Sequence, residues 1–196
     1  MRKSLRTKLR AARRRLSPHQ QRLAAIALSR RLHRDPNFRR ARHIAFYLAN
    51  DGEIDLLPLL RRQTGNKTFY LPLLSESRRP WEATQLLFQP WNPSDTTLTK
   101  NRYGIFEPAY APRKLRAANM LDMVLLPLVG FDQQGNRLGM GKGYYDRTFA
   151  RRSGSWRRPK LLGIAHACQE VTSLPHAEWD VPLDGVVTDK ALCWWR

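Results

Sequence analysis

The run from Met123 to Val129 constrains the fold more than any other part of this sequence. Its seven residues include no charged or polar side chain, a pattern typical of a parallel strand buried on both faces of a sheet. Extended to Phe131, the run covers nine residues, far fewer than the ~20 that a membrane-spanning helix needs. A glycine-rich segment follows, and a helix is then predicted to begin near Tyr144. The run therefore indicates an α/β sheet, and we expect no membrane contact.

Other strand-like segments alternate with predicted helices, the order that produces a parallel sheet with helices on both faces. The predicted strands are His43–Ala49, Lys67–Leu74, Ala83–Gln89, Leu161–Ala165 and Val186–Thr188. The predicted connections are a polar loop over Ser75–Pro80, a long surface loop over Pro90–Pro112, a short element around Arg113–Ala118 and an exposed stretch over Arg151–Lys160. We expect one three-layer α/β domain over residues 1–196, with a mostly parallel central sheet.

Helix signals are strongest in the N-terminal third. A first helix is predicted to end near Leu16, with apolar residues at spacings of three and four along one side. These residues are Leu5, Leu9, Ala12 and Leu16. Ser17 and Gln20 form a capping box that begins a second helix, which should end before Asp35-Pro36. The expected core face of this second helix is Leu23, Ile26, Ala27 and Leu32. A short third helix is predicted to be capped by Asp55 and to point Leu56, Leu57 and Leu60 toward the core.

The chain is strongly basic, with 35 Lys and Arg against 16 Asp and Glu and a net charge of +19. The excess is concentrated in residues 1–42, which hold fifteen basic side chains and a single acidic one, Asp35. We interpret the following arginines as a solvated basic face: Arg13, Arg14, Arg15, Arg39 and Arg40. A mitochondrial presequence is also arginine-rich and poor in acids, so that interpretation stays open. The charge alone also permits a nucleic-acid-binding module.

Cysteine usage indicates a reducing compartment, and we expect a cytoplasmic protein. Only Cys168 and Cys193 occur, and they form no Cys-x-x-Cys pair. Neither a disulfide framework nor a structural zinc site is therefore indicated.

The segment Gly130–Asp146 carries the clearest chemical signal, because five of its seventeen residues are glycine. Between a buried strand and a helix it lies at the carboxyl edge of the sheet, where open α/β folds bind ligands. The Walker phosphate-binding pattern fails at Asn136 and Gly143, and the dinucleotide pattern fails because Gly143 comes one place early. A tight strand-to-helix turn is the structural alternative. Arg137, Lys142 and a possible metal-binding Asp146 favour an anion nest for nucleotide phosphates.

The core of this segment, Arg137-Leu138-Gly139-Met140-Gly141-Lys142-Gly143-Tyr144-Tyr145-Asp146, resembles the signature of the 5-formyltetrahydrofolate cyclo-ligase family. The resemblance covers nearly the whole chain and is closest to the bacterial members. It includes Ser4-Leu5-Arg6, Asp51-Gly52-Glu53-Ile54-Asp55, Gly163-Ile164-Ala165-His166 and Glu178-Trp179-Asp180-Val181-Pro182-Leu183.

The resemblance implies a ligase that converts 5-formyltetrahydrofolate to 5,10-methenyltetrahydrofolate and hydrolyses ATP to ADP and phosphate with Mg²⁺. The family transfers the γ-phosphoryl group to the formyl oxygen, after which N10 of the folate attacks the activated carbon. Such a reaction depends on positioning and charge neutralisation more than on a protein nucleophile. This agrees with the lack of a Ser-His-Asp or Cys-His pattern.

The same resemblance implies the site residues. For ATP they are Arg2, Lys3, Arg6, Arg137, Leu138, Gly139, Met140, Gly141, Lys142, Gly143, Tyr144 and Tyr145. For the folate they are Arg6, Leu48, Glu53, Met140, Gly141, Lys142, Gly143 and Tyr144. The catalytic residues would be Lys142, Arg137 and Tyr144, and the Mg²⁺ ligands would be Asp146 and Asp180. Tyr144 and Tyr145 either stack on a ring or belong to the core, and Asp180 is alternatively a turn residue.

Two other functional hypotheses remain at this stage. One is a nucleic-acid-binding module without enzymatic activity, and the other is an ATP-binding relative that has lost its folate activity. For the enzyme we expect small-molecule substrates, MgATP and a folate that can carry polyglutamate, attracted by the basic surface. Nucleic acid would bind only non-specifically.

Overall fold

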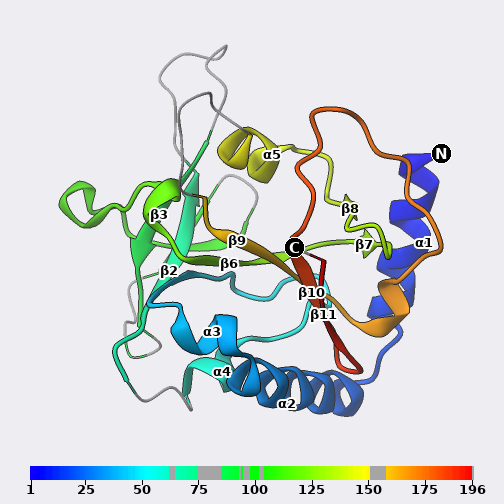
Figure 1. The fold of residues 1–196 in the computed structure, drawn as a ribbon, viewed down its shortest axis with the longest axis horizontal. Helices are drawn as coiled ribbons and strands as arrows, with labels where there is room; N and C mark the ends of the chain where they lie inside the picture. Colours follow the sequence, from blue (N-terminus) through cyan, green and yellow to red (C-terminus); the bar gives the residue numbers. More distant parts are fainter. Residues whose placement is uncertain are drawn as a thin grey trace.

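The computed structural model describes residues 1–61, 65–74, 85–92, 94, 98–101, 104–150 and 158–195 (Figure 1). Its centre is a seven-stranded sheet in the order β11-β10-β9-β6-β1-β2-β3. Neighbours from β10 to β2 pair in parallel, while β11 and β3 pair antiparallel at the two edges. The strands are β1 (His43–Ala45), β2 (Thr68–Leu74), β3 (Leu86–Pro90), β6 (Met123–Pro127), β9 (Lys160–Ile164), β10 (Gly185–Val187) and β11 (Leu192–Trp194). This confirms the predicted mostly parallel α/β sheet.

Helices cover both faces of the sheet. The helices are α1 (Arg2–Arg14), α2 (Pro18–Arg34), α3 (Pro36–Arg40), α4 (Leu57–Arg61) and α5 (Tyr144–Phe149), and the 3₁₀ turns are η1 (Pro112–Lys114), η2 (Ala118–Met120) and η3 (Ala167–Gln169). In Figure 1, α2, α3 and α4 lie below the sheet, α5 lies above it, and α1 stands beside β7 and β8. One buried cluster joins α2 and α4 to the lower face, and a second joins α5 to the upper face. None of the helices among the described residues is long and apolar enough to span a membrane.

The local signals at the helix ends correspond to the structure. Ser17 and Gln20 form both hydrogen bonds of the capping box, and α2 ends before Asp35, whose carboxylate then caps α3. The Asp55 carboxylate accepts a hydrogen bond from the Leu57 amide at the beginning of α4. Because capping depends on side chains three residues apart, these boundaries are readable from sequence.

The core face of α2 was predicted only in part, because Leu32 is buried as expected but Leu23 and Ile26 are not. Leu23 and Ile26 are 53% and 36% exposed, whereas Leu28 and Leu32 are fully buried. Ala24 and Ala25 complete the buried face and pack in the cluster that contains α4. Ala24 and Ala25 were not predicted, although their small side chains allow α2 to approach its neighbours closely. The buried face of α2 is therefore rotated from the predicted one toward Ala24 and Ala25.

Two antiparallel pairs were predicted as loop. β4 (Leu98–Lys100) pairs with β5 (Phe106–Pro108) inside the expected long surface loop, and β7 (Gly130–Phe131) pairs with β8 (Arg137–Leu138) inside the glycine-rich segment. Strands of two or three residues are too short to display a period of two. The buried Asp132 carboxylate closes the second pair by accepting hydrogen bonds from the amides of Gln134 and Asn136.

Several predicted segments differ in length or lie beyond the described ranges. The first strand ends at Ala45 instead of Ala49, although the Phe46 amide still donates to the carbonyl of Tyr70. The Ser75–Pro80 loop, residues 83 and 84 of the third predicted strand, and residues 151–157 of the predicted connection lie outside the described residues.

Candidate active site

A cavity of about 770 Å³ opens at the carboxyl edge of the parallel strands. Its walls include Leu48 after β1, Leu74 at the end of β2 and Leu128 after β6. The predicted site residues that line it are Arg2, Arg6, Leu48, Glu53, Arg137, Leu138, Gly139, Met140, Gly141, Lys142, Gly143, Tyr144, Tyr145, Asp146 and Asp180. Lys3 is exposed and does not line the cavity. Residues from both ends of the chain therefore meet at the sheet edge that the sequence indicated.

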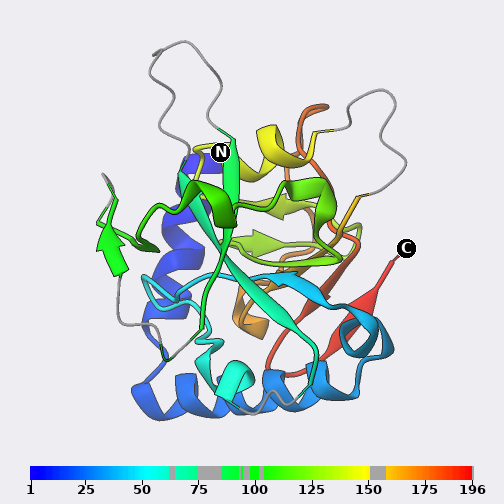
Figure 2. The same ribbon diagram turned by 90° about the vertical axis from the view of Figure 1, so that its left-hand side faces the viewer.

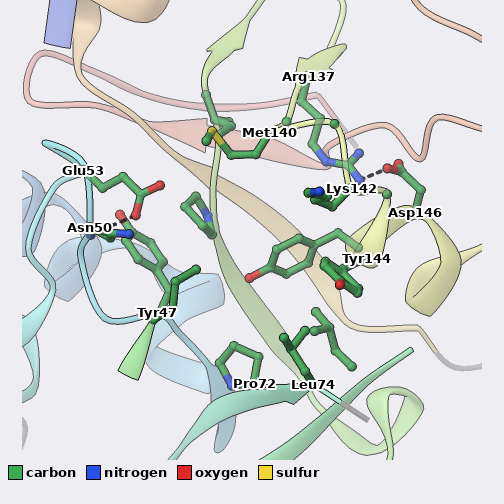
Figure 3. Close-up of a pocket in the computed structure, with 18 of the residues that line it drawn as sticks. Tyr47, Asn50, Glu53, Pro72, Leu74, Arg137, Met140, Lys142, Tyr144 and Asp146 are labelled. Carbon is green, nitrogen blue, oxygen red and sulfur yellow. Dashed lines mark hydrogen bonds and ion pairs between the residues drawn. The ribbon is translucent and has the colours of Figure 1, made fainter. Parts of the chain in front are cut away.

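The cavity has two chemically different sides. Figure 3 shows Glu53, Asn50 and Tyr47 on one side and Arg137, Lys142 and Asp146 on the other. Pro72 and Leu74 form an apolar wall between them. A ligand that fills the cavity therefore meets a basic loop at one end and a carboxyl group at the other.

The loop between β8 and α5 exposes backbone donors to the cavity. Gly141 and Gly143 have φ values of +89° and +64°, in the left-handed region that favours glycine. Within the described part of the chain, the amides of Gly139, Met140, Gly141 and Gly143 donate no hydrogen bond. The carbonyl of Gly139 instead accepts a 2.8 Å hydrogen bond from Nε of Arg6. Amides left in this arrangement are suited to hold an anion.

A mostly buried ion pair between Arg137 and Asp146 holds this loop in place. Nη2 of Arg137 lies 2.6 Å from Oδ1 of Asp146, and the two side chains are 6% and 24% exposed. The same guanidinium donates to the carbonyl of Val181, and the Val181 amide donates to Asp146 at 3.1 Å. Burial lowers the pKa of Arg137, and the charge of Asp146 opposes that change. The pair ties β8, α5 and the segment before β10 together.

Asp180 is the second predicted metal ligand, and it also faces an arginine. Its Oδ2 forms an ion pair with Nη2 of Arg2 and accepts a 2.8 Å hydrogen bond from the Ala177 amide. Among the described residues, no group of three or more His, Cys, Asp or Glu side chains could hold a metal by itself. Two carboxylates do suit Mg²⁺, which usually takes one or two protein carboxylates and completes its shell with phosphate oxygens and water.

The sequence analysis assigned Arg13 to a solvated basic face, and this prediction is wrong. The Arg13 side chain is only 1% exposed. Its Nε and Nη2 donate to the carbonyl and the carboxylate of Asp51 at 2.8 and 2.9 Å. Burial alone would raise the pKa of Asp51, but hydrogen bonds from Arg10, Arg14 and Arg13 outweigh burial and lower that pKa to about 2. These contacts join α1 to the turn after β1.

Glu53 lies beside this cluster at the end of a tight turn. Asp51 and Gly52 both have positive φ, +54° and +77°, which defines a type I′ turn from Asn50 to Glu53. The Asn50 amide donates to the Glu53 carboxylate at 3.1 Å. Burial raises the pKa of Glu53 to about 7, although the charge of Arg13 opposes the rise.

The two tyrosines of the signature have different surroundings. The ring of Tyr145 stacks on Phe149, with centroids 6.3 Å apart and planes 15° apart, and burial raises its pKa. Tyr144 carries the Arg147 guanidinium over its ring at 5.1 Å. Tyr145 therefore serves the core with one face of its ring, and both residues still line the cavity.

Several lining residues were missed by the sequence analysis. Arg13 had a signal, because it follows Arg6 by seven residues and therefore shares its helix face. Asp51 lies within the recognised Asp51–Asp55 stretch. The remaining missed residues include Tyr47, Pro72, Ile105, Phe106 and Trp179. Those in loops and short strands carry no periodic pattern that would have marked them.

These features define an α/β protein with a ligand cavity at the carboxyl edge of its sheet, bordered by a glycine-rich loop with amides that donate no hydrogen bond to the described residues. Comparison with known proteins identifies it further. The chain belongs to the 5-formyltetrahydrofolate cyclo-ligase family, whose model matches residues 1–189. This is the family that the signature resembles.

Relatives and solved structures agree with this assignment. The 5-formyltetrahydrofolate cyclo-ligase of Escherichia coli K12 is 38% identical over 190 residues, covering 95% of this chain and 100% of the relative. That of Haemophilus influenzae is 38% identical over 185 residues, covering 93% and 94%. The 5,10-methenyltetrahydrofolate synthetase of Aquifex aeolicus superposes with a TM-score of 0.79 at 30% identity, over 98% of this chain and 92% of that chain. The Mycoplasma pneumoniae synthetase, at 22% identity and a TM-score of 0.69 over 96% and 98%, shows the same fold.

Proposed function

We propose that this chain catalyses the ATP-dependent conversion of 5-formyltetrahydrofolate to 5,10-methenyltetrahydrofolate, with release of ADP and phosphate. Membership of the cyclo-ligase family supports the reaction type. The carrying observation is that one cavity has Arg137 and loop amides without hydrogen bonds to the described residues on one side and the Glu53 carboxyl group on the other. A triphosphate suits the first side, and a pterin ring with neighbouring N–H donors suits the second.

The chemistry follows from the poor reactivity of a formamide. Its nitrogen donates into the carbonyl group, and its oxygen is a poor leaving group. Transfer of the γ-phosphoryl group to that oxygen converts it into a phosphate ester, and N10 of the same folate then attacks the formyl carbon. The carbon–oxygen bond breaks, phosphate leaves with the former formyl oxygen, and N10 gives up its proton to phosphate or solvent, which leaves the N5–CH–N10 bridge.

The residues of this chain act by positioning and by charge. The amides of Gly139 to Gly143 hold the phosphate oxygens, and Lys142 offsets the charge that moves between the two substrates. Arg137 keeps the loop in place through Asp146 and adds positive charge. Tyr144 borders the folate. Arg2 and Arg6 extend the basic wall from α1, where Arg6 also fixes the loop through the Gly139 carbonyl.

Asp146 and Asp180 are the residues that would hold Mg²⁺ together with phosphate oxygens. Bound there, the ion would neutralise phosphate charge. Both carboxylates already have arginine partners. We therefore infer that the nucleotide must bring much of the ion's coordination shell with it. We further infer a single domain, because Arg2 and Asp180 line the same cavity, and a cytoplasmic location.

The nucleic-acid-binding alternative lacks comparable support. Arg2, Arg10, Arg13 and Arg14 of the basic N-terminal segment are all ion-paired with carboxylates of this chain. Steering of folate polyglutamates by the remaining positive charge is part of our proposal. It predicts that KM falls as glutamates are added, and that this difference shrinks with salt.

The test follows the absorbance of methenyltetrahydrofolate with purified protein, 5-formyltetrahydrofolate and MgATP. We expect ATP-dependent product from the wild type and a loss of about 10²-fold in kcat for Lys142→Ala, the scale found when a charge-stabilising donor is removed. Lys8→Ala is the matched control, since Lys8 is exposed on α1 and lies outside the cavity. No product from folded wild type would refute the function. Equal activity of the two lysine variants would refute only the role of Lys142.

A further inference from the structure

Arg13 joins three separate parts of the chain beneath the cavity. Besides Asp51, its guanidinium donates to the carbonyl of Leu128, directly after β6, at 3.2 Å. Its Nη2 lies 3.6 Å from Oε1 of Glu53. A guanidinium that is 1% exposed and stays charged is costly to bury, so its partners must compensate for that cost. The structure thus places a buried positive charge 3.6 Å from the Glu53 carboxyl group.

The surroundings of Glu53 make its ionisation sensitive to that charge. Arg13 and Arg10 favour the carboxylate, and so does the hydrogen bond from Asn50. Asp51 disfavours the carboxylate, as does burial, which is the largest influence. The phenol groups of Tyr47 and Tyr145 also face it. Arg13 is the arginine that forms an ion pair with Glu53 among the described residues.

The reaction needs this carboxyl group to be ionised. A 2-amino-4-oxopterin presents an N–H and an adjacent NH₂ group, two donors on one edge. A carboxylate accepts from both, whereas a protonated carboxyl group has a donor on one oxygen and accepts poorly there. Ionised Glu53 therefore recognises this edge, and neutral Glu53 does not.

We propose that Arg13 is a positioning residue that keeps the Glu53 carboxylate ionised and aimed at the pterin edge of the folate. This inference rests on the proposed function and goes beyond it, because it assigns a substrate-specific role to an arginine that acts through the Glu53 carboxylate. All three arginines, Arg10, Arg13 and Arg14, form ion pairs with Asp51, but among the described residues Arg13 is the one that also forms an ion pair with Glu53.

Removal of Arg13 takes the 2.8 Å hydrogen bond from the Asp51 carbonyl but leaves partners for the Asp51 carboxylate and for the Leu128 carbonyl. Asp51 keeps its ion pairs with Arg10 and Arg14. The Leu128 carbonyl keeps the 2.8 Å hydrogen bond from Nε2 of Gln169. Arg13→Met fills a similar volume without charge. Asp51 then loses one of its three arginine partners, whereas Glu53 loses the ion pair that it forms among the described residues. Arg14→Met is the matched control, because it removes an Asp51 partner whose side chain is 54% exposed and leaves Glu53 unchanged.

The experiment measures kcat/KM for 5-formyltetrahydrofolate between pH 6.5 and 9 at saturating MgATP. If loss of Arg13 raises the pKa of Glu53 from about 7 to about 8, the ionised fraction at pH 7 falls about fivefold, while at pH 9 it stays above nine tenths. We therefore expect Arg13→Met to lose about fivefold at pH 7 and to recover at pH 9. The loss should appear in KM for the folate, with KM for MgATP unchanged. Arg14→Met should follow the wild-type profile.

Three outcomes would overturn the proposal. They are a loss of the same size at every pH, the same loss in Arg14→Met, and no loss in Arg13→Met. Arg13→Lys covers the case in which the methionine variant does not fold, because lysine keeps the buried charge and should keep the wild-type pH profile at reduced affinity. A shifted profile in Arg13→Lys would count against the proposal. An inactive wild type would instead refute the proposed function.

Discussion

Replacing Glu53 with glutamine should stabilise the protein at neutral pH while impairing its function. The Glu53 side chain is 14% exposed, and burial raises its pKa from 4.5 to about 7 in the fold. The unfolded chain has no such burial, so its Glu53 pKa stays near 4.5. By proton linkage this difference corresponds to about 3 kcal/mol of folding free energy.

The sign follows from which state holds the proton more tightly. Between pH 4.5 and 7 the folded chain binds the Glu53 proton and the unfolded chain does not, so stability falls as the pH rises. The contribution is complete below pH 4.5 and is lost as the pH passes through 7. Glutamine has no proton to lose. The variant should therefore match the wild type at pH 4.5 and exceed it by about 3 kcal/mol at pH 8 and above.

The assay is urea unfolding of both chains at intervals from pH 4.5 to 8.5. Asp51 titrates with a pKa of about 2, below this range, and is common to both chains, so it cancels in the comparison. Glu178→Gln is the control, since Glu178 is exposed and should change stability by less than about 0.5 kcal/mol. If the difference in free energy of unfolding between Glu53→Gln and wild type does not change with pH, burial does not raise the pKa of Glu53 and the reasoning is refuted. In the activity assay, the variant should raise KM for the folate because an amide offers a donor where the pterin needs an acceptor.

Three further predictions test the fold and the loop. Leu28→Ala should lower the free energy of unfolding, measured by chemical denaturation, by about 2–5 kcal/mol, because Leu28 is buried. Leu23→Ala should lower it by less than about 0.5 kcal/mol, because Leu23 is 53% exposed. Equal losses would contradict the assigned buried face of α2. Gly143→Ala should cost about 1–2 kcal/mol of folding free energy, because the φ of Gly143 is +64°, and it should raise KM for ATP. Gly139→Ala should be tolerated by the fold, because the added Cβ meets nothing within 4 Å. Similar melting temperatures for the two variants would argue against strain at Gly143. Mg²⁺ alone should leave the melting temperature of the protein unchanged. Mg²⁺ together with ADP, at about 100 times the Kd of ADP, should raise that temperature by several degrees. An equal rise with Mg²⁺ alone would mean that the carboxylates bind the ion without phosphate.

Much of the sheet was predictable because its signals are local. The apolar run beginning at Met123 corresponds to β6, and the capping box at Ser17 and Gln20 begins α2 where expected. The helix after the glycine-rich segment begins at Tyr144. Each of these features depends on side chains within a few residues of one another, so no knowledge of the tertiary structure was needed.

The basic wall of the site was less predictable because its meaning is tertiary. Arg13 and Asp51 are 38 residues apart, and nothing near Arg13 in the sequence offers it an acidic partner. An arginine that begins a run of three in a basic segment is ordinarily solvated. Its burial results from the turn after β1, where positive φ at Asp51 and Gly52 turns the chain back toward α1. The sequence marked the Asp51–Asp55 stretch through the family resemblance, but not the helix against which it packs.

The docking of α1 explains how one helix can serve both sides of the cavity. Leu9 of α1 packs in a buried cluster with Val129. A Cβ atom at Gly130 would lie 2.5 Å from Cδ1 of Leu9, so a glycine at this position allows α1 to approach β7. Arg6 and Arg13 follow Arg2 by four and eleven residues and therefore share one face of the helix. Arg2 pairs with Asp180 on the nucleotide side, and Arg13 reaches Glu53 on the folate side. A displacement of α1 would consequently change both sides together, whereas removal of Arg13 alone should change only the folate side.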